Sequence, residues 1–197
     1  MKTVLLEGSE LSGKTTIAET IKRRLVEEGF DVTLNIGPID KKALKVGLPL
    51  QIADKIKLPS FQELMYTISL ITDGNPKELY GSDFFLQERY FPSVMAYASI
   101  LNSVGINRYF GNWLKRVYQK FDYNVLIKTS IDSRLERISQ RERKTKLDKM
   151  VEANPQLSAD LERAIQKVLS NERNYFEIDT DEMCAEEAAN EVIRRIT

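Results

Sequence analysis

Hydrophobic positions along this 197-residue chain follow two alternating patterns, short apolar runs and longer stretches with a helical period. The short runs predict five β-strands, at residues 3–6, 32–36, 84–86, 125–127 and 175–178. The helical stretches predict a first helix that stops at Gly29 and further helices at 60–72, 93–103, 107–120, 132–144, 157–171 and 185–196. Residues 40–59 predict a loop with a short helix. The alternation of strands and helices predicts an α/β fold, with helices on both faces of a parallel five-stranded sheet.

The connection between the first strand and the first helix fits the phosphate-loop pattern of two glycines followed by lysine and a hydroxyl residue. Tight turns at Gly8 and Gly13 let the backbone N–H groups wrap round a triphosphate. Lys14 then places a positive charge on the outer phosphates, and the hydroxyl of Thr15 is a ligand for Mg²⁺. The candidate ATP-binding residues are Gly8, Ser9, Glu10, Leu11, Ser12, Gly13, Lys14, Thr15 and Thr16.

The composition narrows the possible chemistry and surroundings. Lys and Arg number 29, as do Asp and Glu, and this balance argues against a broad nucleic-acid or membrane surface. The absence of histidine excludes Ser-His-Asp triads, Cys-His dyads and His-ligated zinc. A lone cysteine, Cys184, predicts a reducing, cytoplasmic setting. The chain opens on its first strand without a long apolar run, so we expect no signal peptide or membrane span.

Ligands of open parallel sheets bind beyond the carboxyl ends of the strands. We therefore expect the loop at 8–15, the turn at 88–90 and the segment after Ile178 to share one rim. Glu88 can hold Mg²⁺ through water or accept a proton from a hydroxyl, and Arg89 can grip a phosphate with its planar fork. The alternative interpretation is that Glu88 and Arg89 form an ordinary surface ion pair at the end of a strand.

A basic run follows the fourth strand and comprises Arg134, Arg137, Arg141, Arg143, Lys144 and Lys146. Phosphoryl transfer requires cations around the migrating group, and the phosphate loop contains no arginine. Arg137 and Arg141 are four residues apart and are expected on one helix face. The alternative interpretation of the basic run is a solvated helix whose positive charge is offset by Glu136 and Glu142.

Two segments resemble the thymidylate kinases. Residues 7–16 are similar to the family's Glu-Gly-x-Asp-Gly-x-Gly-Lys-Thr-Thr, and residues 88–97 are similar to its Asp-Arg-Tyr-x-x-Ser-x-x-Ala-Tyr. Arg137 and Arg141 match its lid arginines. The resemblance implies a P-loop kinase fold and one domain over residues 1–197 with a helical lid around 132–150. It also implies transfer of a phosphoryl group from ATP to a nucleoside monophosphate, with dTMP as the first candidate acceptor.

The resemblance also implies a role for each matched donor-side residue. Lys14 and the loop amides hold the ATP phosphates. Thr15 binds Mg²⁺ directly, while Glu88 holds the ion through water. The lid arginines that close over the transferring group are Arg137, Arg141 and Arg143.

On the acceptor side, the resemblance implies that Arg89 contacts the acceptor phosphate and that Glu10 meets the sugar 3′-hydroxyl. Tyr97 packs near C2′ and favours a deoxy sugar, and Tyr66 lies by the base or, alternatively, in the core. The family is usually dimeric, which makes a homodimer an expectation from the resemblance.

Four departures from the family pattern all fall on the acceptor side. Glu88 replaces an aspartate, Ala98 replaces a glutamine, residues 68–70 lack an arginine, and residues 36–38 replace an Arg-Glu-Pro turn. Loss of hydrogen bonds in such a pocket changes substrate selection by orders of magnitude.

Two rival functions remain open. Deoxynucleoside kinases have Glu-Arg-Ser where this chain has Glu88-Arg89-Tyr90, but they need a base after the second strand, where only Asp40 is present. A nucleotide-binding protein without catalysis is the other rival, and the lid arginines argue against it because binding alone needs no transition-state cations.

Overall fold

The structure, a computed structural model, describes residues 1–37, 81–100, 118–144 and 146–197. Its sheet has five strands in the order β2-β3-β1-β4-β5, and all neighbouring strands are parallel. The strands are β1 (Lys2–Glu7), β2 (Val32–Ile36), β3 (Phe84–Glu88), β4 (Tyr123–Lys128) and β5 (Tyr175–Asp179). The sequence prediction of a five-stranded parallel sheet is confirmed.

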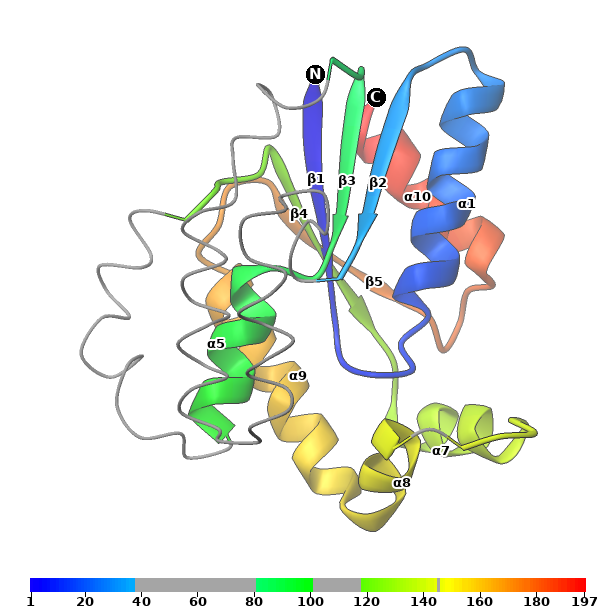
Figure 1. The fold of residues 1–197 in the computed structure, drawn as a ribbon, viewed down its shortest axis with the longest axis vertical. Coiled ribbons are helices and arrows are strands. Elements are labelled where there is room, and N and C mark those ends of the chain that lie inside the picture. Colours follow the sequence, from blue (N-terminus) through cyan, green and yellow to red (C-terminus); the bar gives the residue numbers. More distant parts are fainter. Residues whose placement is uncertain (38–80, 101–117, 145) are drawn as a thin grey trace, which may run out of the picture.

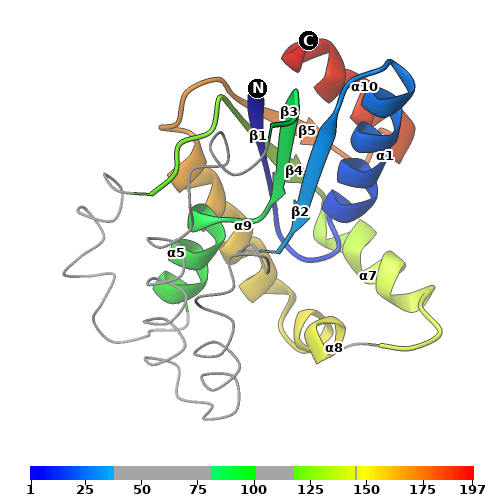
Figure 2. The same ribbon diagram turned by 45° about the horizontal axis from the view of Figure 1, so that its top comes forward.

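Helices cover both faces of the sheet (Figure 1). On one face lie α1 (Lys14–Glu27) and α10 (Ala185–Ile196), and on the other lie α5 (Phe91–Ile100) and α9 (Pro155–Leu169). Two short helices, α7 (Ile131–Ser139) and α8 (Lys146–Ala153), lie beyond the carboxyl ends of the strands (Figure 2). None of the helices in the described part of the chain is long and apolar enough to cross a membrane.

The hydrophobic core lies in two layers because successive side chains of a strand point to opposite faces. In β1, Val4 and Leu6 pack against the α1 and α10 layer, whereas Leu5 packs against the α5 and α9 layer. This double burial explains why the central strands are continuous apolar runs in the sequence.

The predicted helix at 132–144 is wrong over residues 140–144, because α7 ends at Ser139. The segment Gln140–Lys144 has no apolar residue to bury, and short helices depend on such packing. The chain instead begins a separate helix, α8, in which Val151 is buried. The helix predicted at 107–120 is also wrong at its end, because residues 118–120 are not helical.

Some expectations fall outside the described residues. They are the loop at 40–59 with the candidate base Asp40, the helix at 60–72 with Tyr66, residues 101–103 of the helix predicted at 93–103, and residues 107–117 of the helix predicted at 107–120.

We expect Ile21→Ala to lower the free energy of unfolding by roughly 2–5 kcal/mol, because Ile21 is fully buried between α1 and the sheet and truncation leaves a cavity. Urea unfolding followed by circular dichroism measures this change. The control is Val26→Ala on the same helix, where the side chain is 51% exposed and the expected change is within about 0.5 kcal/mol. Equal losses in the two variants would contradict the packing described for α1.

Candidate active site

The phosphate loop starts at a position that only glycine can occupy. Gly8 has a φ of 153°, and a Cβ atom there would lie 2.3 Å from the carbonyl oxygen of Ile127 in β4. Gly13 has a φ of 87° and is the N-cap of α1, so the loop ends where the helix begins. The loop thus turns tightly against the end of β4 and directs the positive end of α1 toward the rim of the sheet.

Lys14 folds back over the loop. Its Nζ donates to the carbonyl oxygen of Ser9 at 2.5 Å and to Ser12 Oγ at 3.2 Å. Burial, followed by the neighbouring charge of Arg89, lowers the pKa of Lys14 to about 7, although nearby carboxylates act in the opposite direction. A buried amine of this kind gains its charge most readily when an anion is bound beside it.

Thr15 and Glu88 meet across the rim. The Thr15 hydroxyl donates to both carboxylate oxygens of Glu88, at 3.0 and 2.9 Å. Glu88 is the last residue of β3 and is buried, so its carboxylate is held at this position. Carboxylate and hydroxyl oxygens are the ligands that Mg²⁺ prefers, and the two candidate metal ligands from the sequence therefore lie together.

This oxygen pair cannot enclose a metal ion alone. No group of three His, Cys, Asp or Glu side chains that could hold an ion occurs among residues 1–37, 81–100, 118–144 and 146–197. Such a site matches Mg²⁺, which typically takes one or two protein ligands and completes its shell with waters and substrate phosphates.

Glu10, Arg89 and Tyr97, three residues expected from the sequence at the acceptor, form a second cluster. Glu10 Oε1 accepts from Arg89 Nη2 at 2.5 Å and from the Tyr97 hydroxyl at 2.9 Å. Burial opposes ionisation of Glu10, but Arg89, Lys14 and Tyr97 together outweigh it and lower the pKa of Glu10. Burial, reinforced by Glu10, raises the pKa of Tyr97, which keeps its hydroxyl protonated. The cluster is therefore an ionised carboxylate held by two donors.

Arg89 reaches this cluster from an unusual backbone conformation. Its φ is 62°, in the left-handed region that side chains other than glycine seldom adopt. Residues held in such conformations cost about 1–3 kcal/mol each and concentrate at functional sites. The turn after β3 thus has a constraint that directs Arg89 to Glu10.

Gln87, whose part in the site the sequence did not reveal, supports this turn. Its Nε2 donates to the carbonyl oxygens of Gly37 at 2.6 Å, Arg89 at 2.8 Å and Glu88 at 3.1 Å. Its Oε1 accepts from Asn35 Nδ2 at 2.9 Å. A polar residue directly after the apolar run Phe84–Leu86 was the only signal in the sequence that could have identified this role.

Glu7 is a second buried group whose role is visible only in the structure. Its carboxylate accepts from the backbone N–H groups of Tyr90 at 2.7 Å and Ser93 at 3.2 Å, and from Ser93 Oγ at 2.5 Å. Burial raises the pKa of Glu7, partly offset by these hydrogen bonds. Glu7 fixes the start of α5, the helix that presents Tyr97.

Arg137 lies over the phosphate loop. Its guanidinium donates to the carbonyl oxygen of Leu11 at 2.7 Å, to Thr129 Oγ1 at 3.3 Å and to the carbonyl oxygen of Thr180 at 3.1 Å. Arg137 and Arg141 line one cavity of about 440 Å³ beside the loop, although Arg141 lies beyond the end of α7.

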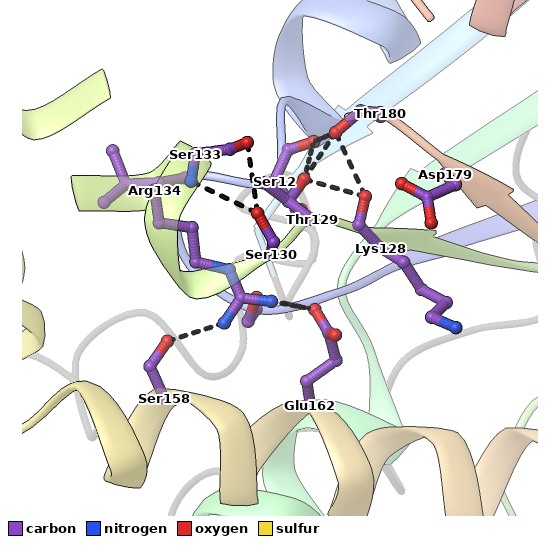
Figure 3. A network of polar contacts seen from close by, with 12 residues as sticks. Ser12, Lys128, Thr129, Ser130, Ser133, Arg134, Ser158, Glu162, Asp179 and Thr180 are labelled. Carbon is purple, nitrogen blue, oxygen red and sulfur yellow. Dashed lines mark hydrogen bonds and ion pairs between the residues drawn. The ribbon is translucent and has the colours of Figure 1, made fainter. Parts of the chain in front are cut away.

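The other cations of the basic run differ from one another. Arg141 pairs with buried Asp148 of α8 at 2.8 Å, and Arg143 is exposed in the α7–α8 connection. Arg134, by contrast, is buried and directed toward α9 (Figure 3). It is neither solvated nor a cation facing the rim, so neither sequence interpretation of the run describes it.

The expected common rim is confirmed by contacts between the three segments. Thr15 of the loop region contacts Glu88, and Thr180 Oγ1, beyond β5, donates to the carbonyl oxygen of Ser12 at 3.3 Å. One rim therefore carries the phosphate loop with its buried lysine, the Thr15–Glu88 oxygen pair and the Glu10–Arg89–Tyr97 cluster. This arrangement can bind a polyphosphate with a divalent cation next to a second, hydroxyl-bearing ligand.

Comparison with solved structures identifies the fold. The chain matches thymidylate kinase from Candida albicans with a TM-score of 0.69 and 16% identity, over 98% of this chain and 89% of that one. It matches deoxyadenosine kinase from M. mycoides with a TM-score of 0.64 and 15% identity, over 98% of this chain and 97% of that one. No protein-family model and no curated protein sequence matches the chain. The chain therefore has the α/β P-loop kinase fold that these two structures share.

The lowered pKa of Lys14 predicts that the free energy of unfolding rises with pH above about 7. Between that value and the ordinary 10.5, the unfolded chain holds a proton on Lys14 that the folded chain has lost. The rise is at most about 1.4 kcal/mol per pH unit. Urea unfolding of the wild type and of Lys14→Met at pH 7, 8 and 9 measures how the free energy of unfolding changes with pH. Lys14→Met should lack the part of this pH dependence that Lys14 causes.

Lys22→Met serves as the matched control, because Lys22 is an exposed residue of the same helix. This variant should keep the wild-type slope. A wild-type slope in Lys14→Met as well would show that Lys14 does not cause the pH dependence.

Gln87→Leu should lower the free energy of unfolding by about 1–3 kcal/mol, because it leaves buried partners of the turn without their hydrogen bonds. Urea unfolding measures the loss. Gln156→Leu, at an exposed position of α9, should change it by less than about 0.5 kcal/mol. Unchanged stability in Gln87→Leu would mean that the turn does not depend on this side chain.

Proposed function

We propose that this protein transfers the γ-phosphoryl group of ATP to a nucleoside monophosphate, with dTMP as the first candidate acceptor. The observation that carries the proposal is the position of Glu10. This residue belongs to the phosphate loop, yet its carboxylate binds Arg89 and Tyr97 on the acceptor side. A donor site and a site for a hydroxyl-bearing anion are thereby joined through one side chain.

On the donor side, the loop amides and Lys14 would bind the phosphates of ATP. The cavity of about 440 Å³ beside the loop is the place for the donor nucleoside. The residues present fit Mg²⁺, because the hydroxyl of Thr15 and both carboxylate oxygens of Glu88 lie together. Thr15 would bind the ion directly, and Glu88 would hold it through water. When bound, Mg²⁺ neutralises negative charge on the phosphate oxygens.

On the acceptor side, Arg89 would bind the monophosphate with its planar fork. Glu10, kept ionised by Arg89 and Lys14, would accept a hydrogen bond from the sugar 3′-hydroxyl. Tyr97 would pack near C2′ and favour a deoxy sugar. An acceptor phosphate is already anionic near neutral pH, so this reaction needs no general base.

The lid would supply the remaining cations. We propose that the chain acts as one domain, with residues 132–150 as a lid in which Arg137, Arg141 and Arg143 serve the transferring group. Arg137 already contacts the loop through the Leu11 carbonyl, and Arg141 lines the same cavity. We further propose a cytoplasmic enzyme, with a homodimer as its expected assembly.

A deoxynucleoside kinase is the second candidate, because Glu88 is longer than the aspartate of the thymidylate kinase pattern and one structural neighbour is a deoxyadenosine kinase. In that reaction a carboxylate must accept a proton from the acceptor hydroxyl. Both oxygens of Glu88 instead accept from Thr15, an arrangement that favours metal binding over base catalysis.

The test is a panel of nucleosides and nucleoside monophosphates, each mixed with purified protein and Mg-ATP while ADP release is followed. We expect turnover with monophosphates. Lys14→Ala should lower this turnover by at least about a hundredfold, because the transferring phosphate loses a buried cation. Turnover with nucleosides alone would favour the second candidate. No turnover with any acceptor, despite ATP binding, would favour a nucleotide-binding protein without catalysis.

A further inference from the structure

Arg134 is the largest fully buried side chain in the described part of the molecule, with 1% of its surface exposed. It lies on α7 and extends its guanidinium toward α9 (Figure 3). Nη1 donates to Ser158 Oγ at 2.9 Å, and Nη2 pairs with Glu162 Oε2. Its Nε has no hydrogen-bond partner among the described atoms. Burial lowers the pKa of Arg134, against the opposing influence of Glu162.

The same oxygen of Glu162 also contacts the phosphate loop. Ser9 Oγ, itself fully buried, donates to Glu162 Oε2 at 3.0 Å. The carbonyl oxygen of Ser9 in turn accepts from Lys14 Nζ at 2.5 Å. Continuous polar contacts therefore run from Arg134 through Glu162 and Ser9 to the lysine of the phosphate loop.

Stability alone does not account for this arrangement. A buried ion pair loses hydration that its own attraction only partly recovers, and apolar side chains of similar volume are often as stabilising. The unpartnered Nε of Arg134 adds to this loss. The arrangement does, however, fix the direction of the Ser9 peptide, because a side-chain hydrogen bond and a carbonyl hydrogen bond hold it from two sides.

We propose that Arg134 and Glu162 are positioning residues that set Ser9, and through its carbonyl Lys14, for binding the phosphates of ATP. The pair also ties α7 to the loop at a second point, since Arg137 of the same helix binds the Leu11 carbonyl. Movement of α7 is thereby coupled to the loop on both sides of Glu10. This inference rests on the proposed function, because it takes the loop as the ATP site.

The test is a double-mutant cycle of Ser9→Ala and Arg134→Met, with the Kd for Mg-ATP measured by isothermal titration calorimetry. Each single variant should raise the Kd about three- to tenfold, the range expected when a hydrogen bond that orders the site is lost. In the Ser9→Ala background, Arg134→Met should change the Kd little further, because the hydrogen bond that links Glu162 to the loop is already absent. If the double variant raises the Kd by the product of the two single-variant factors, the two residues act independently and the proposal is overturned.

Three controls separate positioning from general damage. Ser158→Ala removes a contact of Arg134 that does not lead to the loop and should leave the Kd unchanged. Glu162→Gln keeps an acceptor oxygen for Ser9 and should raise the Kd less than Glu162→Ala does. If Arg134→Met does not fold, Arg134→Lys completes the cycle, with thermal unfolding of each variant as the check.

The outcomes distinguish this inference from the function on which it rests. Wild-type protein that does not bind Mg-ATP would overturn the proposed function and this inference together. Wild-type binding with an unchanged Kd in both Ser9→Ala and Arg134→Met would overturn the positioning role alone.

Discussion

The close approach of the phosphate loop to β4 is the constraint on which the rest of the site depends. Gly8 passes so near the carbonyl of Ile127 that no side chain fits there, and this contact places the loop directly over the ends of the central strands. With β1 paired to β3 on one side and β4 on the other, Glu88 and Thr129 necessarily end beside the loop. The candidate site residues converge because parallel strands end at one edge.

Three carboxylates organise this edge of the sheet. Glu7 holds the start of α5, Glu10 holds Arg89 and Tyr97, and Glu88 holds the Thr15 hydroxyl. Each is buried or half-buried and accepts hydrogen bonds, as carboxylates in such surroundings require. Glu7 and Glu10 have several donors, whereas both oxygens of Glu88 accept from the Thr15 hydroxyl. The left-handed backbone of Arg89 persists because these contacts and Gln87 define the turn from both sides.

Features that depend on local pattern could be predicted from the sequence, whereas those that depend on distant neighbours could not. The five strands and the loop follow from apolar runs and glycine spacing, and the structure confirms them. The burial of Arg134 depends on its contacts with Ser158 and Glu162 of α9, and the spacing of residues along α7 does not reveal these partners. Gln87 was likewise unpredictable, because its partners belong to a turn and a second strand.

The charges around Lys14 give a physical reason why this edge would bind an anion. Burial disfavours the charged amine, and Arg89 adds a second positive charge nearby, which the surrounding carboxylates offset only in part. A bound polyphosphate would restore the missing negative charge in a site that already excludes water, where each charge interaction is stronger than in solution. Neutralising Lys14 by an apolar substitution relieves the burial of the amine and also removes the attraction for the anion. The same burial that opposes the folded state therefore favours phosphate binding.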